Sequence, residues 1–239
     1  MTKLLLAWDI DGTLVTTGTN HTRNALTDAL GEVLGRPIAA NFSMSGMTDY
    51  QIMETLLANN NAPLSFATEA LSRLDRNTTE FVGYKEYAVP GAKPALVRSH
   101  NAGHLNVLLT GNTPLTARCK LAAAGYDVNL FDWDLSAFGN TTPNRAHLAK
   151  KIADLASSRN RTAVAIGDTP ADSVAATTAS LLFCAVATGN PSYEDLANYP
   201  HDLLIHNLVT GRLAFETFLE ALVMAPSQQS LASVHFLTV

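Results

Sequence analysis

The stretch that decides the fold runs from Leu4 to Thr13 and reads LLLAWDIDGT. A short apolar run that ends in two acids and a glycine is typical of a buried strand in a parallel sheet. Open α/β folds place their chemistry at the carboxyl end of such strands. Gly12 allows the backbone to turn there, so that the carboxylates of Asp9 and Asp11 can face one site. Paired acids at this point suit a metal-assisted nucleophile with a general acid/base partner.

Two other interpretations compete for this stretch. A calcium-binding EF-hand loop needs a glycine at its sixth position and an acid at its twelfth. Counted from Asp9, the glycine falls at the fourth position and Asn20 at the twelfth, so this loop is excluded. A plain surface turn remains open for residues 9–12 taken alone. The apolar strand before them and the motifs farther along the chain favour a functional site.

Length and composition narrow the class of protein. The 239 residues can form one sizeable core, or a core with a small inserted module. Hydrophobic residues make up 47% and charged residues 15%, which is typical of a globular protein. The net charge of −5, without a basic run, disfavours binding to nucleic acid. The oligomeric state cannot be predicted from these features.

The predicted cellular location follows from the apolar stretches and the cysteines. No apolar stretch approaches the roughly 18–20 residues of a membrane span. A strand begins directly after Met-Thr-Lys, which leaves no room for a signal peptide. Cys119 and Cys184 lie in apolar patterns and are expected to be buried free thiols in a reducing compartment. We therefore expect a cytoplasmic protein that does not associate with a membrane.

Strands and helices are predicted to alternate from Gly91 onward. This rhythm predicts a parallel sheet that is covered by helices on both faces, with right-handed crossovers. The expected strands are 105–109, 163–166 and 181–187, with a further edge at 203–205, and the expected helices are 92–101, 114–124 and 144–156.

Residues 16–90 interrupt this alternation. Helices are expected at 21–34 and 49–58, with one or two more within 65–87, and no convincing strand lies between them. We therefore expect a core domain of residues 1–15 and 91–239 and an inserted helical domain of residues 16–90. The natural hinges are Thr16–Thr19 and Pro90-Gly91.

A second strand end carries Thr110, Gly111 and Asn112. A hydroxyl with adjacent backbone N–H groups can hold phosphate oxygens. An ordinary turn explains the same three residues. A third strand end carries Asp168 behind a glycine, with Asp172 four residues on. A helix cap is the alternative explanation of Asp172, but we favour a functional role for both acids.

Clustered acids would repel a phosphate unless a hard divalent cation bridged them. Carboxylate oxygens with water are the ligands that Mg²⁺ prefers. The seven histidines include no His-x-His and no His-Glu-x-x-His, which disfavours zinc.

The order of these three motifs resembles that of the haloacid dehalogenase (HAD) superfamily, and the resemblance extends from Lys3 to about Leu208. The insertion directly after the first motif is similar to the helical C1 cap of that superfamily. The resemblance implies an α/β fold, a Rossmann-like parallel sheet covered by helices on both faces, with an inserted all-helical cap domain. Within the superfamily, the chain resembles the phosphoglycolate-phosphatase-like branch.

The resemblance also implies roles for the motif residues. Asp9 would be the nucleophile and would form an aspartyl-phosphate. Asp11 would protonate the leaving oxygen and then deprotonate the attacking water. Thr110 would bind the phosphoryl group together with the adjacent Gly111 and Asn112. Mg²⁺ would be held by Asp9, Asp168 and the main-chain carbonyl of Asp11, with Asp172 in or just behind the coordination shell.

The chain departs from the family in the cation that faces the nucleophile. The family pattern has a lysine about 25 residues before the last motif, whereas this chain has Pro143 at that spacing before Asp168. Arg145 is the nearest cation and could hold phosphate with two hydrogen bonds. Lys150 and Lys151 are the other candidates. Alternatively, all three are ordinary solvated helix charges.

In the family that the chain resembles, an acid two residues after the nucleophile, here Asp11, implies an oxygen leaving group. The resemblance therefore implies a Mg²⁺-dependent phosphatase that hydrolyses a small phosphomonoester metabolite. A phosphosugar mutase and a non-catalytic binding protein with the same fold remain alternatives. Residues 42–50 resemble the specificity loop of C1 caps and suggest a small polar substrate, with Gly46 allowing close approach. Thr48 and Asp49 in this loop are explained equally well as a helix cap.

Overall fold

The central element of the protein is a six-stranded sheet whose order is β3-β2-β1-β4-β5-β6 and in which every pair of neighbours is parallel. The computed structural model describes residues 3–16, 21–80 and 86–224, of which 79 and 80 by their backbone alone. The strands are β1 (Leu5–Trp8), β2 (Leu105–Thr110), β3 (Ala137–Phe138), β4 (Ala163–Gly167), β5 (Leu182–Val186) and β6 (Leu203–Ile205). The predicted doubly covered parallel sheet is confirmed.

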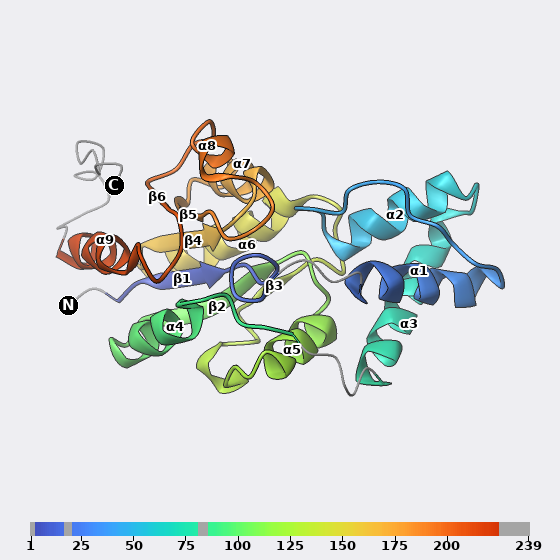
Figure 1. Ribbon diagram of the computed structural model, residues 1–239, viewed down its shortest axis with the longest axis horizontal. Coiled ribbons are helices and arrows are strands. Elements are labelled where there is room, and N and C mark those ends of the chain that lie inside the picture. The colour runs from blue at the N-terminus through green and yellow to red at the C-terminus, as the bar shows by residue number, and fades with distance from the viewer. Residues whose placement is uncertain (1–2, 17–20, 81–85, 225–239) are drawn as a thin grey trace.

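The two faces of the sheet carry separate hydrophobic layers because side chains alternate along β1. Leu6 and Trp8 pack on one face, and Leu5 and Ala7 on the other, all fully buried. The first face is covered by α4 (Ala92–Asn101), α5 (Pro114–Ala123) and α9 (Arg212–Met224). The second is covered by α6 (Arg145–Ser158), α7 (Pro170–Thr178) and the short α8 (Tyr193–Leu196). Figure 1 shows the two groups of helices on either side of the strands.

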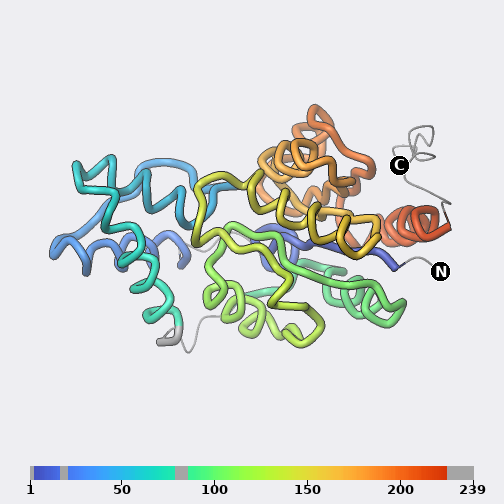
Figure 2. The backbone as a smooth tube through the Cα atoms, turned by 180° about the vertical axis from the view of Figure 1, so that it is seen from behind, coloured from blue at the N-terminus to red at the C-terminus, as the bar shows by residue number. Residues whose placement is uncertain are grey.

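The helices between β1 and β2 have a hydrophobic core of their own. They are α1 (His21–Leu34), α2 (Asp49–Asn59) and α3 (Ala67–Glu80), the last preceded by a 3₁₀ turn at Leu64–Phe66. Their apolar faces pack on one another through residues such as Leu30, Met53 and Leu74. Figures 1 and 2 show this helical unit beyond one end of the sheet. The predicted helical insertion is therefore present, while its division at residues 16 and 90 stays a prediction.

The structure adds elements that the sequence pattern did not predict. Strand β3 has two residues, which is too short for any periodicity to register. The helix expected within 65–87 ends at Glu80, and residues 81–85 lie outside the described part of the chain, as do residues 17–19 of the proposed first hinge. Both cysteines are free, but Cys119 is only partly buried, contrary to expectation.

No helix among the described residues is long and apolar enough to cross a membrane.

A buried hydrogen-bonded chain fixes β1 just before its first acid. The indole N–H of Trp8 donates to Asn106 Oδ1 at 2.9 Å, and Ser99 Oγ donates to the same oxygen at 2.8 Å. Trp8 also packs against Phe215 of α9, with ring centroids 6.0 Å apart. The side chain that precedes Asp9 is thus locked by both packing and polar contacts.

Replacing Trp8 with Phe should therefore lower the free energy of unfolding by about 2 kcal/mol, because it removes a buried hydrogen bond and leaves a small void. Urea denaturation followed by circular dichroism measures the change. Trp133→Phe is the matched control, since that indole is only partly buried and its loss should cost less. A smaller loss for Trp8→Phe than for Trp133→Phe would contradict the assigned role of Trp8.

Candidate active site

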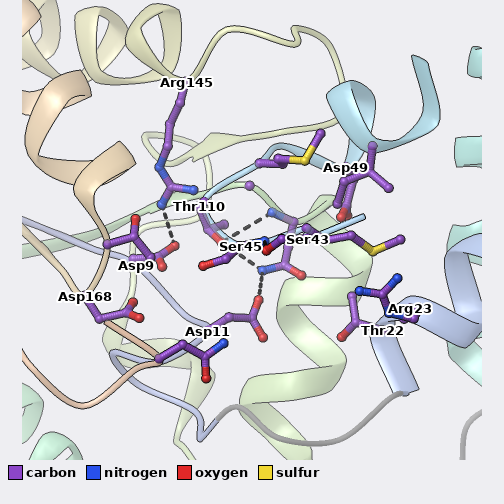
Figure 3. A pocket seen from close by; sticks show the side chains of 18 of the residues that line it. Asp9, Asp11, Thr22, Arg23, Ser43, Ser45, Asp49, Thr110, Arg145 and Asp168 are labelled. Atoms are coloured by element: carbon purple, nitrogen blue, oxygen red, sulfur yellow. Dashed lines mark hydrogen bonds and ion pairs between the residues drawn. The ribbon is translucent and has the colours of Figure 1, made fainter. Parts of the chain in front are cut away.

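Three strand ends meet at one polar cavity. The cavity has a volume of about 320 Å³. Asp9 follows β1, Thr110 ends β2 and Asp168 follows β4, and all three line it. Because β1 lies between β2 and β4, these ends are adjacent at the carboxyl edge of the sheet, where the chain reverses its direction of winding. Figure 3 shows their side chains converging from the sheet side.

The turn after β1 brings the sheet residues together. Gly12 has φ of +88°, a left-handed conformation that residues with a side chain rarely adopt. A Cβ atom at this position would lie 2.1 Å from Asp168 Oδ2. The Gly12 carbonyl also accepts a hydrogen bond from Thr188 Oγ1 at 2.5 Å. Glycine is therefore required here both for the turn and for the close approach of the Asp168 carboxylate.

Three buried carboxylates form a cluster beneath the cavity. Oxygen atoms of Asp9, Asp168 and Asp172 all lie within 4.8 Å of one another. Burial, opposed by Arg145 but reinforced by Asp172, raises the pKa of Asp9 to about 7. Burial and the neighbouring Asp9 and Asp172 also raise the pKa of Asp168 well above its ordinary value. Such under-compensated oxygen ligands fit a hard divalent cation.

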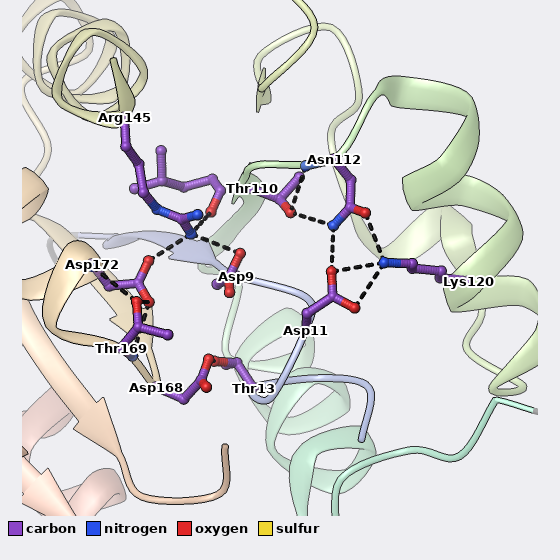
Figure 4. Close-up of polar contacts among 11 residues, drawn as sticks. Asp9, Asp11, Thr13, Thr110, Asn112, Lys120, Arg145, Asp168, Thr169 and Asp172 are labelled. Carbon is purple, nitrogen blue, oxygen red and sulfur yellow. Dashed lines mark hydrogen bonds and ion pairs between the residues drawn. The ribbon is translucent and has the colours of Figure 1, made fainter. Parts of the chain in front are cut away.

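Arg145 is the cation that lies against this cluster. Arg145 is the first residue of α6. Its Nη2 atom lies 2.8 Å from Asp9 Oδ1 and 2.5 Å from Asp172 Oδ1 (Figure 4). The two other candidate cations lie elsewhere. Lys150 forms an exposed ion pair with Asp154, and the Lys151 ammonium donates to the carbonyl of Ser136. The structure thus places Arg145, rather than either lysine, beside Asp9.

Asp172 also takes part in a helix cap, through two groups of Thr169. Its Oδ2 accepts hydrogen bonds from the backbone N–H of Thr169 at 3.0 Å and from the Thr169 hydroxyl at 2.6 Å. Thr169 in turn caps the first turn of α7, so the pair forms a capping box. Because Oδ2 serves the cap and Oδ1 serves Arg145, the helix-cap and functional interpretations of Asp172 are compatible.

Asp11 points to a different wall of the cavity and is held by a lysine. Lys120 Nζ lies 2.8 Å from both of its carboxylate oxygens, and Asn112 Nδ2 donates to Oδ2 at 2.7 Å. Burial alone would raise the pKa of Asp11, but the Lys120 ammonium and these hydrogen bonds hold it below its ordinary value. The side chain of Asp11 is thus ionised and separate from the carboxylate cluster.

Lys120 is a site residue that sequence reasoning missed. A single lysine in the helix of residues 114–123 looks like an ordinary solvated charge. A signal was available, because Lys120 lies one turn after Thr116 and next to Leu121, on the face that α5 buries. Its ammonium group also donates to Asn112 Oδ1 at 2.8 Å. Asn112 thereby links Lys120 to Thr110, whose Oγ1 accepts from Asn112 Nδ2 at 2.9 Å.

The start of α2 closes the opposite side of the cavity. Thr48 caps α2, because its Oγ1 accepts from the N–H of Gln51 at 3.1 Å, and it also donates to the carbonyl of Thr142 at 2.8 Å. The backbone N–H groups of Asp49 and Tyr50 donate to core carbonyls, those of Gly111 at 2.7 Å and Gly139 at 2.9 Å. The helical insertion is therefore docked directly on the loops after β2 and β3.

Two glycines allow this close approach. A Cβ atom at Gly111 would lie 2.3 Å from the carbonyl oxygen of Met47. Gly46, in the left-handed region with φ of +73°, lies where a Cβ atom would be 2.7 Å from the side chain of Ala171. Other residues from the insertion also line the cavity, among them Thr22, Arg23, Ser43, Ser45 and Asp49.

The site thus combines a doubly covered parallel α/β sheet, acids at adjacent strand ends and a docked helical insertion. The sequence profile of the haloacid dehalogenase-like hydrolase family matches residues 6–177, and the chain belongs to this family. No curated protein matches the sequence significantly.

Solved structures share the fold at low identity. A predicted phosphatase from Clostridium acetobutylicum has a TM-score of 0.63 at 17% identity, over 92% of this chain and 100% of that one. A β-phosphoglucomutase from Clostridium difficile has a TM-score of 0.64 at 19% identity, over 93% and 100%. A predicted phosphoglycolate phosphatase from Haemophilus somnus has a TM-score of 0.63 at 17% identity, over 90% and 98%. The likeness extends over nearly the whole length of each chain.

A divalent cation should stabilise the folded protein, since it relieves the repulsion between buried carboxylates. We expect saturating Mg²⁺ to raise the thermal midpoint by about 5 °C, on the basis of ligand linkage for a chain of this size. Differential scanning fluorimetry with and without Mg²⁺ measures the shift. It should vanish in Asp168→Asn and persist in Asp154→Asn, which changes an exposed acid. An equal shift in both variants would place the cation elsewhere.

Proposed function

We propose that this hydrolase is a Mg²⁺-dependent phosphatase that cleaves a small phosphomonoester through an aspartyl-phosphate formed on Asp9. The observation that carries the proposal is the position of the Asp9 carboxylate. It lies at the floor of a polar cavity, 2.8 Å from Arg145 and within the carboxylate cluster. Phosphoryl transfer needs in-line positioning and neutralisation of spread negative charge, and Arg145 beside Asp9 supports the second of these.

The carboxylate cluster fits Mg²⁺ by the chemistry of its donors. Asp9 and Asp168 would supply oxygen ligands, the Asp11 main-chain carbonyl would add a third, and Asp172 would stand in or just behind this set. When bound, the ion would neutralise charge on the phosphoryl oxygens and bring them to the nucleophile. The raised pKa values of Asp9 and Asp168 support this role, because both groups lack a full counter-charge in the protein alone.

Asp9 acts as the nucleophile in the proposed reaction. One of its oxygens forms a bond to phosphorus while the bond from phosphorus to the leaving oxygen breaks. Water then attacks the aspartyl-phosphate, and Asp9 departs as a carboxylate. Arg145 stabilises the charge that develops on the transferring oxygens, and burial does not discharge it, because the carboxylates of Asp172 and Asp9 raise the pKa of its guanidinium.

Asp11 acts as the general acid and general base in the proposed reaction. Held by Lys120, it is ionised, which is the form that takes a proton from the attacking water. In the first step the leaving oxygen needs a proton from the protonated form of Asp11. We propose that Asp11 leaves its contacts with Lys120 and Asn112 for that step, since they favour the carboxylate.

The loop after β2 forms the phosphate cradle. The Oγ1 atom of Thr110 accepts two hydrogen bonds from Asn112, one from its backbone N–H at 3.3 Å and one from its side chain at 2.9 Å. With its acceptor capacity in use, the hydroxyl hydrogen of Thr110 can donate to a phosphate oxygen. Gly111 lies between these two residues and lines the cavity.

Other parts of the proposal concern the assignment within the family. The chain would belong to the phosphoglycolate-phosphatase-like branch, with residues 16–90 as a C1-type cap on the core of residues 1–15 and 91–239. The substrate would be a small phosphorylated metabolite in the cytoplasm. Phosphosugar mutation is the alternative, and a solved β-phosphoglucomutase does share the fold. A mutase would transfer the phosphoryl group to a sugar phosphate instead of releasing phosphate, so product analysis separates the two.

Removing the metal should abolish turnover. We expect the protein to release phosphate from p-nitrophenyl phosphate with Mg²⁺, to lose this activity after treatment with a chelator, and to regain it when Mg²⁺ alone is restored. Asp9→Asn should remain folded but inactive, and should form no phospho-enzyme when probed by mass spectrometry with a phosphate mimic. Full activity after exhaustive chelation, or an adduct on another residue, would refute the mechanism.

Loss of Arg145 should impair rate more than binding. Arg145→Ala is expected to lower kcat by about 100-fold or more, by analogy with the loss of one preorganised charge-stabilising donor. Arg145→Lys should recover only part of the rate, because the ammonium lacks the planar fork. Steady-state kinetics measures both, with Lys150→Ala as the control that should leave kcat nearly unchanged. A larger loss in the control would show that the role was assigned to the wrong residue.

A further inference from the structure

Asp49 is a buried acid that faces the cavity with one oxygen unused. It is 3% exposed, and its Oδ2 accepts a hydrogen bond from the backbone N–H of Thr113 at 2.8 Å. Among the described residues, no donor reaches Oδ1. Asp49 lines the cavity, and Figure 3 shows it on the side opposite Asp9, the same side as Thr22 and Arg23. Oδ1 is not among the buried side-chain atoms that lack a partner, so it is open to the cavity and can accept a hydrogen bond from a bound molecule.

The surroundings of Asp49 do not supply the missing counter-charge. Burial raises the pKa of Asp49 to about 7, although Lys120 and the Thr113 N–H oppose the increase, and Asp11 and Asp75 add to it. Lys120 is already paired with Asp11. Glu86 adds a second, half-buried acid to the wall of the cavity, and burial raises its pKa as well. Of the charged residues that line the cavity away from Asp9 and Arg145, Asp49 and Glu86 are thus acidic and Arg23 is the single cation.

We propose that Asp49 selects the leaving-group half of the substrate by accepting a hydrogen bond from an ammonium or hydroxyl group, and that it rejects a second anionic group there. The inference rests on the proposed phosphatase function and names the class of substrate: a phosphate monoester of a small amino alcohol or polyol. The cavity of about 320 Å³ lies at the lower end of the range for small-molecule sites, which favours a small substrate.

Arg23 offers the competing interpretation. Its guanidinium lines the cavity and could bind a carboxylate or a second phosphate. However, Nη1 donates to the carbonyl of Ala40 at 2.6 Å and Nη2 to the carbonyl of Phe42 at 2.9 Å. These bonds tie the loop before α2 to α1, so that Arg23 has a structural role that is independent of substrate. Asp49 has no such role for its second oxygen.

Four substrates of nearly equal length test the proposal. They are 2-aminoethyl phosphate, 2-hydroxyethyl phosphate, ethyl phosphate and phosphoglycolate, which present an ammonium, a hydroxyl, no polar group and a carboxylate at the same distance from phosphorus. We expect kcat/KM for the first two to exceed that for ethyl phosphate by at least about tenfold, the value of one hydrogen bond to a charged acceptor. Phosphoglycolate should be the poorest of the four.

Asp49→Asn should reverse the preference. The amide oxygen can keep the bond to the N–H of Thr113, while the amide N–H₂ turns the free acceptor into a donor. We expect the ratio of kcat/KM for 2-aminoethyl phosphate to that for phosphoglycolate to fall by about 100-fold or more, the product of a tenfold loss for one substrate and a tenfold gain for the other. This ratio does not depend on the fraction of folded enzyme. Asp75→Asn is the control, because it neutralises an acid that accepts a hydrogen bond from the Thr113 hydroxyl at 2.6 Å and does not line the cavity, so it should leave the ratio unchanged.

The outcomes are distinguishable. Equal kcat/KM for all four substrates, or an unchanged ratio in Asp49→Asn, would overturn the inference while the phosphatase function stands. A wild-type preference for phosphoglycolate that is lost in Arg23→Gln would replace it with recognition of a second anion. If p-nitrophenyl phosphate is not hydrolysed either, the proposed function itself is wrong and the inference falls with it.

Discussion

The structure depends on the ion pairs that Arg145 makes with Asp9 and Asp172. Three carboxylates are buried together at the carboxyl edge of the sheet, and without a cation their mutual repulsion and desolvation would be severely destabilising. The guanidinium joins β1, the start of α6 and the start of α7 at a single point. Because the same contacts orient the Asp9 carboxylate, the arrangement that makes this crowded edge stable is also the one that prepares it for phosphate.

The polar network on the other side of Asp9 has a different character. Lys120 and Asn112 hold Asp11 apart from the cluster, and the contrast shows in the pKa shifts, which are upward for Asp9 and downward for Asp11. Two acids separated by one residue in sequence therefore have opposite protonation tendencies. Enzymes use such differences in environment to give distinct tasks to chemically identical groups. The division arises because burial and the neighbouring acids outweigh Arg145 at Asp9, whereas Lys120 and Asn112 outweigh burial at Asp11.

Much of this site could be predicted because its residues follow buried strands. Asp9, Thr110 and Asp168 come directly after apolar runs, and parallel strands bring such positions to one edge whatever the details of packing. Arg145 was also within reach, since its spacing before Asp168 places it at the start of a helix on that edge. Its partnership with Asp172 could not be read from the sequence, because it depends on how α6 and α7 pack against each other.

The role of Lys120 in the site and the cavity-facing position of Asp49 were not predicted from the sequence, for a related reason. A lysine within a helix and an acid at the start of one have ordinary explanations, solvation and capping, that satisfy local rules completely. Only the packing of α5 on the sheet buries Lys120, and only the docking of α2 turns Asp49 toward the cavity. Strand β3 was not predicted for a different reason, because its two residues are too few to show a periodic pattern.

The docking of α2 has a consequence for how this protein can diversify. The N–H groups of Asp49 and Tyr50 reach the carbonyls of Gly111 and Gly139, so two of the hydrogen bonds between insertion and core join main chain to main chain, beside the side-chain bonds of Thr48 and Asp49. Other side chains of the loop before α2 can then change during evolution without breaking these bonds. Gly46 and Gly111, by contrast, are expected to stay glycine, because neither position has room for an added methyl group.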